Sequence, residues 1–218
     1  MKKKLGLFKL AICITLFATP GLMVRAQTHY NLQQLLKEDQ VITVPSHETK
    51  ILKDNKKEAI TTKGIVWLKG VPFKQGTIDI DLRGKNVFLK SFLGIAFHGI
   101  DTITCEILYF RPFNFRHEDT LRRKWSVAYM SLPDNNYAKL RKEHPLVYEN
   151  SVTPVPKPDE WFHATIVVKD KKLSVYVNHS AIPSLEVTLL NERPDGLFGL
   201  YSDGLTNDFA NLSITPIK

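Results

Sequence analysis

The stretch GTIDIDL, Gly76 to Leu82, alternates strictly between apolar and polar side chains. Apolar residues occupy every second position from Ile78 to Leu82, and polar residues stand between them. Because side chains of a β-strand point alternately to its two faces, this pattern predicts a strand with one face toward an apolar core. The opposite face would carry Asp79 and Asp81 outward.

Short runs of β-branched and aromatic residues recur on both sides of this stretch, from residue 40 to the end of the chain. Helical signals are sparse and are limited to Leu32–Lys37 and Tyr137–Lys142. Roughly ten strands without a repeating βα pattern predict an all-β sandwich rather than a parallel sheet, with helix below about 15%. The other predicted strands are Val41–Val44, Ile65–Leu68, Phe92–Phe97, Ile103–Phe110, Trp125–Met130, Phe162–Lys169, Leu173–Val177, Leu197–Tyr201 and Phe209–Thr215.

The first 26 residues combine three early lysines, a mostly apolar run and a small residue before Gln27. This order predicts a signal peptide cleaved after Val24-Arg25-Ala26, an imperfect form of the usual cleavage pattern. The alternative is a membrane anchor, but Lys9 and Pro20 leave an apolar run that is short for a span of about 20 residues. We therefore expect residues 27–218 to form one exported domain, periplasmic or extracellular, that does not span the membrane.

Removal of this leader would change the charge of the chain. The full sequence has 30 Lys and Arg against 22 Asp and Glu, a formal net charge of +8. Five basic residues and no acidic ones lie in the leader, so the mature chain would carry a net charge of +3. That excess is too small to indicate nucleic acid as a partner.

Cys105, the one cysteine outside the leader, has apolar neighbours and is expected to be a buried hydrophobic residue rather than a nucleophile.

Seven fragments between Lys63 and Thr215 carry a resemblance: GTIDIDLRG, FLGIAFHG, EILYFRPFNFR, WSVAYMS, LRKEHPLVYEN, EWFHATIVVKDKKLSVYVN and DGLFGLYSDGLTNDFANLSI. Their order and spacing resemble the concanavalin A-like lectin/glucanase superfamily, and in particular secreted bacterial laminin-G-like or 3-keto-disaccharide-hydrolase-like domains. The resemblance implies a jelly roll of two packed antiparallel sheets, one with a concave face. Ligands in such folds often bind on that face or at its rim.

The fragment EILYFRPFNFR, Glu106 to Arg116, combines aromatic rings with two arginines and a carboxylate. A carbohydrate offers C–H faces that stack on rings, and hydroxyls that need fixed donors and acceptors. A glycan or oligosaccharide is therefore the expected partner. The candidate ligand-binding residues are Arg111, Asn114, Arg116, Trp125 and Tyr129.

The alternation of a strand constrains these candidates. Arg111 would share a side with Tyr109, and Glu106 would lie on the other side, so Arg111 and Glu106 cannot face one cleft. Pro112 should end the regular strand and place Arg111 where the chain turns out. Arg111 could contact a ligand, or it could pair with a nearby carboxylate and hold a loop.

The fragment WSVAY offers a second group of rings. Trp125 and Tyr129 would lie on one side of a strand and could form an aromatic platform for a sugar. The alternative is that both rings fill the core of the sandwich. We expect Arg111, Trp125 and Tyr129 to line one ligand surface.

Catalytic carboxylates are poorly represented. Glycoside hydrolysis usually needs two carboxylates about 5–9 Å apart, and glucanases of this superfamily commonly carry an E-x-D-x-x-E strand. The nearest match here, Asp79-Ile80-Asp81, lacks both glutamates, and an outward acidic face is the simpler account of it. If the chain were an enzyme, the weak candidates for catalysis would be Glu106, Asp79 and His98.

Metal-binding signals are also weak, and no cofactor is expected apart from a possible Ca²⁺. Asp203-Gly204 and Asn207-Asp208 could supply oxygens to calcium, as loops do in laminin-G-like relatives, with Asp203 and Asp208 as candidates. The same residues are common turn formers. His117-Glu118-Asp119 clusters ligand types, but adjacent residues on a loop rarely all reach one metal.

Three functions stay open at this level, since a fold does not fix a function. The first is a secreted, lectin-like glycan-binding module, which the aromatic and arginine-rich fragment and the missing catalytic motif favour. The second is a sugar-active enzyme, a glycosidic-bond hydrolase or lyase of the 3-keto-disaccharide-hydrolase type. The third is a protein-interaction or structural domain without a sugar site.

Overall fold

The computed structural model describes residues 26–43, 48–54 and 57–217. Strands make up 51% and helices 11% of it, which confirms the predicted all-β fold. The predicted signal peptide lies outside the described residues, apart from its last residue, Ala26. None of the helices in the described part of the chain is long and apolar enough to cross a membrane.

Two long strands, β4 (Ala59–Phe73) and β13 (Gly196–Pro216), connect the two layers of the sandwich. They pair antiparallel with each other, and the register of this pairing shifts between Ser202 and Asn207 of β13. Before the shift β13 pairs with β6 (Ser91–Gly99), and after it β13 pairs with β5 (Gly76–Arg83). The hydrogen-bonded sheet therefore folds over at this point and supplies both layers.

Glycines allow this bend. Gly64 of β4 and Gly204 of β13 have φ angles of 83° and 78°, a region that residues with a Cβ adopt at a cost. A Cβ on Gly204 would also lie 2.3 Å from the carbonyl oxygen of Lys90. The bend thus needs glycine at position 204 for both conformation and space.

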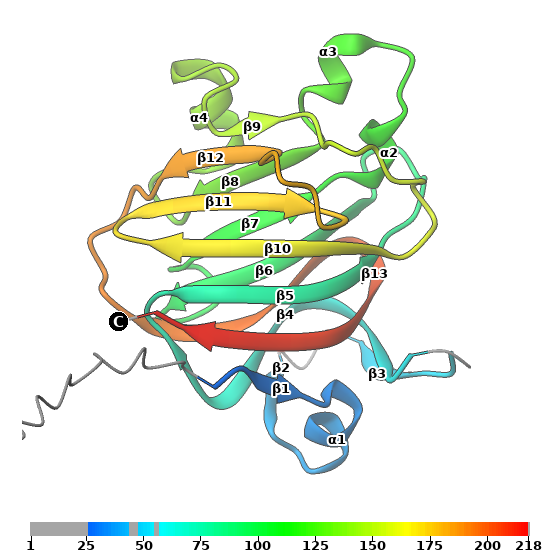
Figure 1. The fold of residues 1–218 in the computed structure, drawn as a ribbon, viewed down its shortest axis with the longest axis vertical. Helices are drawn as coiled ribbons and strands as arrows, with labels where there is room; N and C mark the ends of the chain where they lie inside the picture. Colours follow the sequence, from blue (N-terminus) through cyan, green and yellow to red (C-terminus); the bar gives the residue numbers. More distant parts are fainter. Residues whose placement is uncertain (1–25, 44–47, 55–56, 218) are drawn as a thin grey trace, which may run out of the picture.

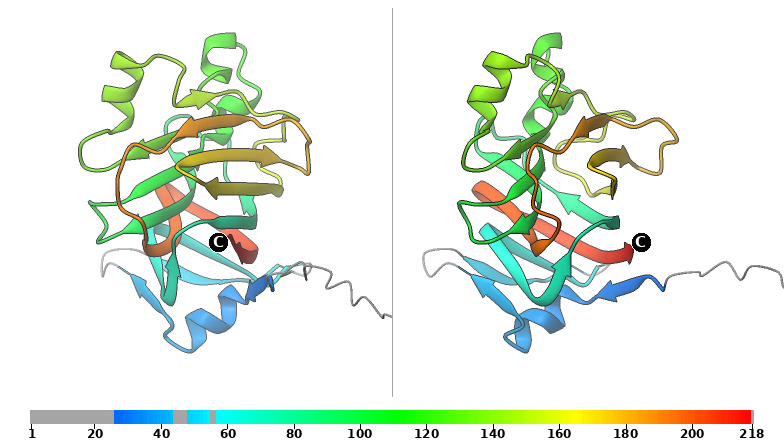
Figure 2. Two further views of the ribbon diagram at one scale, coloured as in Figure 1. Left: turned by 60° about the vertical axis from the view of Figure 1, so that its left-hand side comes forward. Right: turned by 90° about the vertical axis from the view of Figure 1, so that its left-hand side faces the viewer.

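The first layer has the order β9-β8-β7-β6-β13-β4-β2, and the second has the order β12-β11-β10-β5-β13-β4, with β1 paired to β13 and β3 paired to β4. Figures 1 and 2 show β10, β11 and β12 lying over β6, β7 and β8. The remaining strands are β1 (Thr28–Tyr30), β2 (Val41–Thr43), β3 (Thr49–Leu52), β7 (Glu106–Phe110), β8 (Val127–Ser131), β9 (Glu149–Asn150), β10 (Phe162–Lys169), β11 (Lys172–Val177) and β12 (Leu185–Thr188).

The main core lies between the layers and follows the predicted alternation. Ile78, Ile80 and Leu82 all belong to this core and are fully buried. On β7 the side chains divide between two faces. Leu108 and Phe110 enter the main core, whereas Tyr109 joins a second apolar cluster on the outer face of the first layer. This division confirms the predicted facing of the strand that leads to Arg111.

The second cluster also contains Cys105, which is buried as predicted. Burial raises the pKa of its thiol to about 12. A thiol with so high a pKa is almost entirely protonated near neutral pH and makes a poor nucleophile.

The described residues also form four short helices: α1 (Leu32–Lys37), α2 (Pro112–Phe115), α3 (Thr120–Arg123) and α4 (Tyr137–Glu143). The sequence predicted α1 and α4 but not α2 or α3. The Asn136 side chain caps α4 by accepting from the backbone N–H groups of Ala138 and Lys139. Figure 1 shows α2, α3 and α4 gathered at one end of the sandwich, near β8 and β9.

Candidate ligand-binding site

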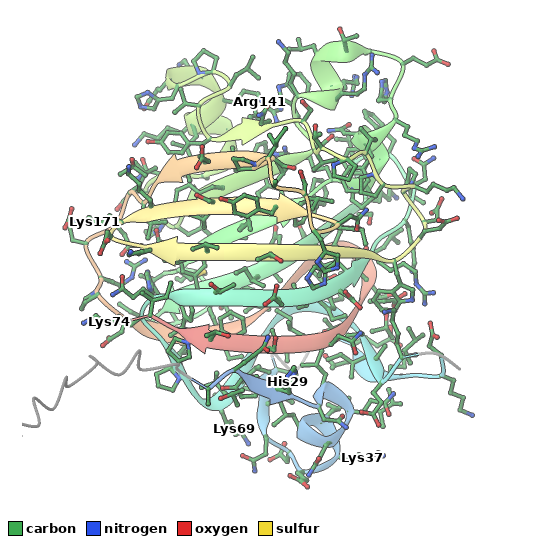
Figure 3. The ribbon with its side chains drawn as sticks, in the orientation of Figure 1. His29, Lys37, Lys69, Lys74, Arg141 and Lys171 are labelled. Carbon is green, nitrogen blue, oxygen red and sulfur yellow. The ribbon has the colours of Figure 1, made fainter. Side chains whose placement is uncertain are left out.

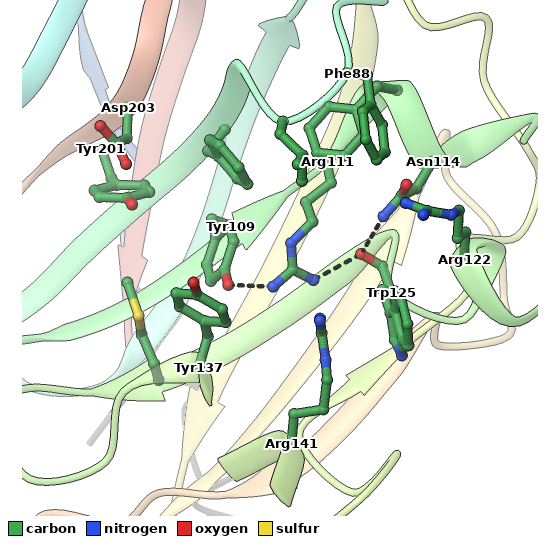
Figure 4. Close-up of a pocket in the computed structure, with 14 residues that line it drawn as sticks. Phe88, Tyr109, Arg111, Asn114, Arg122, Trp125, Tyr137, Arg141, Tyr201 and Asp203 are labelled. Atoms are coloured by element: carbon green, nitrogen blue, oxygen red, sulfur yellow. Dashed lines mark hydrogen bonds between the residues drawn. The ribbon is translucent and has the colours of Figure 1, made fainter. Parts of the chain in front are cut away.

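A pocket of about 330 Å³ opens on the outer face of the first layer (Figure 4). Strand residues that point away from the main core supply part of its wall. The β5–β6 loop, the helices α2, α3 and α4, and Arg111 and Trp125 beside them supply the rest. Most of the lining side chains are aromatic or are arginines. The lining residues are Phe88, Leu89, Phe92, Tyr109, Arg111, Phe113, Asn114, Arg122, Trp125, Met130, Tyr137, Arg141, Tyr201 and Asp203.

Arg111 is the most buried cation of the pocket, with 4% of its surface exposed. Its Nη1 donates to the backbone oxygen of Trp125 at 2.7 Å and to Glu149 Oε2 at 3.3 Å, and its Nη2 donates to the Tyr109 hydroxyl. The guanidinium lies 4.7 Å from the centre of the Tyr109 ring. Arg111 therefore pairs with a carboxylate, as one of the two sequence-based interpretations has it. It also lines the pocket, and its contact with a ligand stays a prediction.

Glu149 is the carboxylate that holds the arginines in place. It is buried, and Arg141 donates to both of its oxygens, from Nε at 2.7 Å and from Nη2 at 2.6 Å. Burial alone would lower the pKa of Arg141, but the hydrogen bonds to Glu149 raise it above its usual value. Two guanidinium groups on one buried carboxylate leave little freedom in this wall of the pocket.

Each arginine of the pocket also stacks on an aromatic ring. The guanidinium carbon of Arg141 lies 4.0 Å from the centre of the Trp125 ring, and that of Arg122 lies 4.6 Å from the Phe88 ring. A planar guanidinium over a ring face is favourable and fixes the orientation of both groups. The pocket therefore offers preformed apolar faces next to charged donors.

Asn114 adds an unpaired acceptor. It lies on α2, is 2% exposed, and its Nδ2 donates to the Trp125 backbone oxygen at 3.3 Å. Its Oδ1 is buried and has no hydrogen-bond partner in the described part of the chain. A buried acceptor without a donor is costly to the fold.

Tyr129 does not join this pocket, contrary to the predicted aromatic platform. It is 1% exposed and packs in the main core with Val127. The strand β8 begins only at Val127, and Trp125 lies in a turn after α3, with its N–H bonded to the Arg122 carbonyl. Because the two-residue alternation of β8 does not extend back to Trp125, the rings of Trp125 and Tyr129 do not face the same side.

Arg116 also lies outside the pocket. It is exposed and donates to the backbone oxygens of Pro156 and Val155, so it holds the segment before β10.

Of the two calcium candidates, Asp203 lines the pocket, while Asp208 is paired with Arg83 at 2.9 Å. No group of three or more His, Cys, Asp or Glu side chains in the described ranges is arranged so that it could hold a metal ion.

Glu106 and His98, two of the catalytic candidates, lie inside the sandwich. Glu106 is fully buried, and its Oε2 lies 2.6 Å from His98 Nδ1. The Tyr129 hydroxyl donates to Glu106 Oε1 and accepts from the Leu190 N–H, while His98 Nε2 lies 2.7 Å from the Lys74 carbonyl oxygen. This network satisfies buried polar groups, and neither candidate lines the pocket.

Asp79, the third catalytic candidate, lies in a separate cluster on the outer face of the second layer. His163 of β10 stands between the two aspartates of β5, with Nδ1 at 2.8 Å from Asp81 and Nε2 at 3.3 Å from Asp79. His29 lines the hollow beside this cluster, whereas Arg141 lines the pocket. These two residues lie toward opposite ends of the molecule (Figure 3), so Asp79 does not meet the other candidates.

The pKa values of His163 and Asp81 in this cluster are shifted, so the stability that these two charges contribute depends on pH. Hydrogen bonds to Asp79 and Asp81 raise the pKa of His163 from 6.5 to about 9. Burial alone would raise the pKa of Asp81, but hydrogen bonds from His163, Lys57 and Asn211 lower it to about 2. The stabilisation by charged His163 is complete below pH 6.5 and is lost as the pH rises through about 9. The contribution of Asp81 is present above pH 3.8 and is lost as the pH falls through about 2.

We predict that the stability advantage of the wild type over His163→Gln shrinks by up to about 3 kcal/mol between pH 6 and pH 10. Urea unfolding of both proteins across this range would measure it. A difference that stays constant with pH would show that His163 is not held in its charged form.

Several residues of the pocket were not predicted from the sequence. Arg122, Tyr137 and Arg141 line it from α3 and α4, and the buried Glu149 of β9 supports its arginines from outside the lining. The fragment LRKEHPLVYEN contains two of them, but no local pattern indicates that its arginine and glutamate close on Arg111.

The sequence matches no protein-family model and no curated protein. Solved structures with a similar fold include the carbohydrate-binding module CBM66 from Bacillus subtilis, with a TM-score of 0.53 and 12% identity over 78% of this chain and 95% of that chain. A putative glycosyl hydrolase from Parabacteroides distasonis has a TM-score of 0.55 and 13% identity over 82% of this chain and 94% of that chain. These similarities support the lectin-like jelly-roll fold that the sequence implied.

Proposed function

We propose that this chain is an exported, lectin-like protein that binds a carbohydrate in the pocket between Arg111, Asn114 and Trp125. The observation that carries the proposal is the wall of the pocket, in which stacked rings stand beside oriented guanidinium donors. A sugar needs apolar faces for its C–H groups and fixed partners for its hydroxyls.

Binding accounts for this pocket better than bond cleavage does. Asp203 is the one carboxylate among the described residues that line it, whereas glycoside hydrolysis generally uses a pair. The catalytic candidates Glu106, His98 and Asp79 lie elsewhere, and the first two are buried. Of the two similar structures, one is named a carbohydrate-binding module and the other a putative glycosyl hydrolase, so both names concern carbohydrates.

Replacing Trp125 with alanine should weaken glycan binding by about 5- to 150-fold, because a stacking aromatic contributes about 1–3 kcal/mol to affinity. Folding should survive, since Trp125 is only partly buried and lies in a turn. Wild type and variant would be compared on a glycan array, by calorimetric titration with the best glycan, and by thermal melting.

Trp161→Ala is the matched control for this experiment. Trp161 is also partly buried and stacks on an arginine, with the guanidinium carbon of Arg83 4.6 Å from its ring centre. It lines a hollow beside His163 rather than the pocket. If Trp161→Ala lost binding and Trp125→Ala kept it, the sugar would bind at the wrong place for the proposal.

A further inference from the structure

We propose that the glycan bound in this pocket is acidic, and that its carboxylate or sulfate group lies against Arg122 and Arg141. This inference rests on the proposed carbohydrate-binding function and adds the charge of the ligand. It goes beyond that function because stacked rings and guanidinium donors would also suit a neutral sugar.

The balance of charge at one end of the pocket supports an anionic ligand. Arg111, Arg122 and Arg141 all line this end, and Glu149 is the buried carboxylate that neutralises part of their charge. Arg122 also has Asp119 at 3.7 Å, but both side chains of that pair are well exposed, and such pairs interact weakly. At least one positive charge therefore stays unmatched by a close buried partner.

The donors that remain open point to the same chemistry. Arg141 uses Nε and Nη2 on Glu149, and no hydrogen bond from its Nη1 occurs among the described residues. Arg122 likewise makes no hydrogen bond through Nη1 or Nη2 within the described ranges, and its one ion pair is through Nε. Planar guanidinium groups with free Nη donors match the oxygens of a carboxylate or sulfate.

The opposite end of the pocket would repel a second anion. Figure 4 shows Tyr201 and Asp203 on one side of the pocket and Asn114, Arg122 and Trp125 on the other. Asp203 is exposed, and its carboxylate can accept from sugar hydroxyls but disfavours an acidic group. The pocket is therefore polarised and would orient a glycan with its acidic group toward the arginines.

The size of the pocket limits how much of the glycan it holds. A volume of about 330 Å³ is near the lower end of about 300–1,000 Å³ for small-molecule sites. It suits one acidic residue of a glycan rather than a long segment. The exposed side chains of Phe88 and Leu89 at the rim would contact the next residue of the glycan.

Paired glycans that differ only in the acidic group would test the inference. One arm compares oligogalacturonate with its methyl ester, and a second compares a sulfated oligosaccharide with its desulfated form, both by calorimetric titration. We expect the acidic member of at least one pair to bind at least tenfold more tightly, and which pair shows this would identify the group. The preference should fall as salt is raised, because part of it is electrostatic.

Arg122→Gln should reduce this preference for the acidic member at least fivefold. The matched control is Arg123→Gln, because Arg123 is the next residue of α3, is exposed, and does not line the pocket. Both variants remove one positive charge, so a difference in binding between them would come from a local contact with the ligand. The control should keep the wild-type preference for the acidic glycan.

Three results would overturn the inference. Equal affinity for both members of every pair would show a neutral-sugar site and leave the proposed function standing. An equal loss of preference in Arg122→Gln and Arg123→Gln would show diffuse charge attraction instead of a site. Binding of neither member of any pair, nor of any glycan on the array, would mean that both the inference and the proposed function are wrong.

Discussion

Replacing Tyr129 with alanine is expected to lower the free energy of unfolding by about 3–5 kcal/mol. The ring is almost fully buried in the main core and packs against Tyr148, with the two ring centres 5.9 Å apart. Its removal would leave a cavity and would also deprive the buried Glu106 carboxylate of a hydrogen bond. Urea unfolding followed by circular dichroism would measure the loss.

Tyr129→Phe is the control that keeps the ring and removes only the hydroxyl. It should cost about 1–3 kcal/mol, because Glu106 and the Leu190 N–H each lose a buried partner. If Tyr129→Ala lost less than about 1 kcal/mol of stability but abolished glycan binding, Tyr129 would belong to the ligand surface as the sequence first suggested.

Glu149→Gln should lower the free energy of unfolding by a similar amount, about 3–5 kcal/mol. The amide keeps the shape of the side chain but removes the charge that neutralises Arg111, which is too buried to turn toward water. Arg141 is more exposed and can rehydrate in part, so Arg111 accounts for most of the expected loss. The same unfolding measurement applies.

Glu118→Gln is the matched control for Glu149→Gln, since Glu118 is exposed and makes no ion pair among the described residues. It should change stability by less than about 0.5 kcal/mol. A loss below about 1 kcal/mol for Glu149→Gln would contradict the role of Glu149 as the charge that holds the arginines together.

The fold was predictable because its main signal is local. The alternation at Ile78, Ile80 and Leu82 fixes which face of β5 enters the core, and the same rule places Tyr109 and Leu108 on opposite faces of β7. The bend at Gly204 was not predictable, because it depends on β13 changing partners between β6 and β5.

The site was predictable only in part, because only some of its residues are indicated by a local pattern in the sequence. Arg111, Asn114 and Trp125 lie near one another along the chain, and all three line the pocket. Tyr129 was misplaced because the alternation was extended across a turn, where it does not apply. Glu149 and Arg141 reach Arg111 only through the packing of α4 and β9, which no short stretch of sequence encodes.

A crystal structure of the protein with the tightest-binding glycan from the array would test the central claim most directly. The account predicts one sugar residue in the pocket, with its C–H face on the exposed part of the Trp125 ring and an acidic group against Arg122 and Arg141. A glycan bound instead in the hollow lined by His163 and Trp161, with the pocket empty, would contradict it.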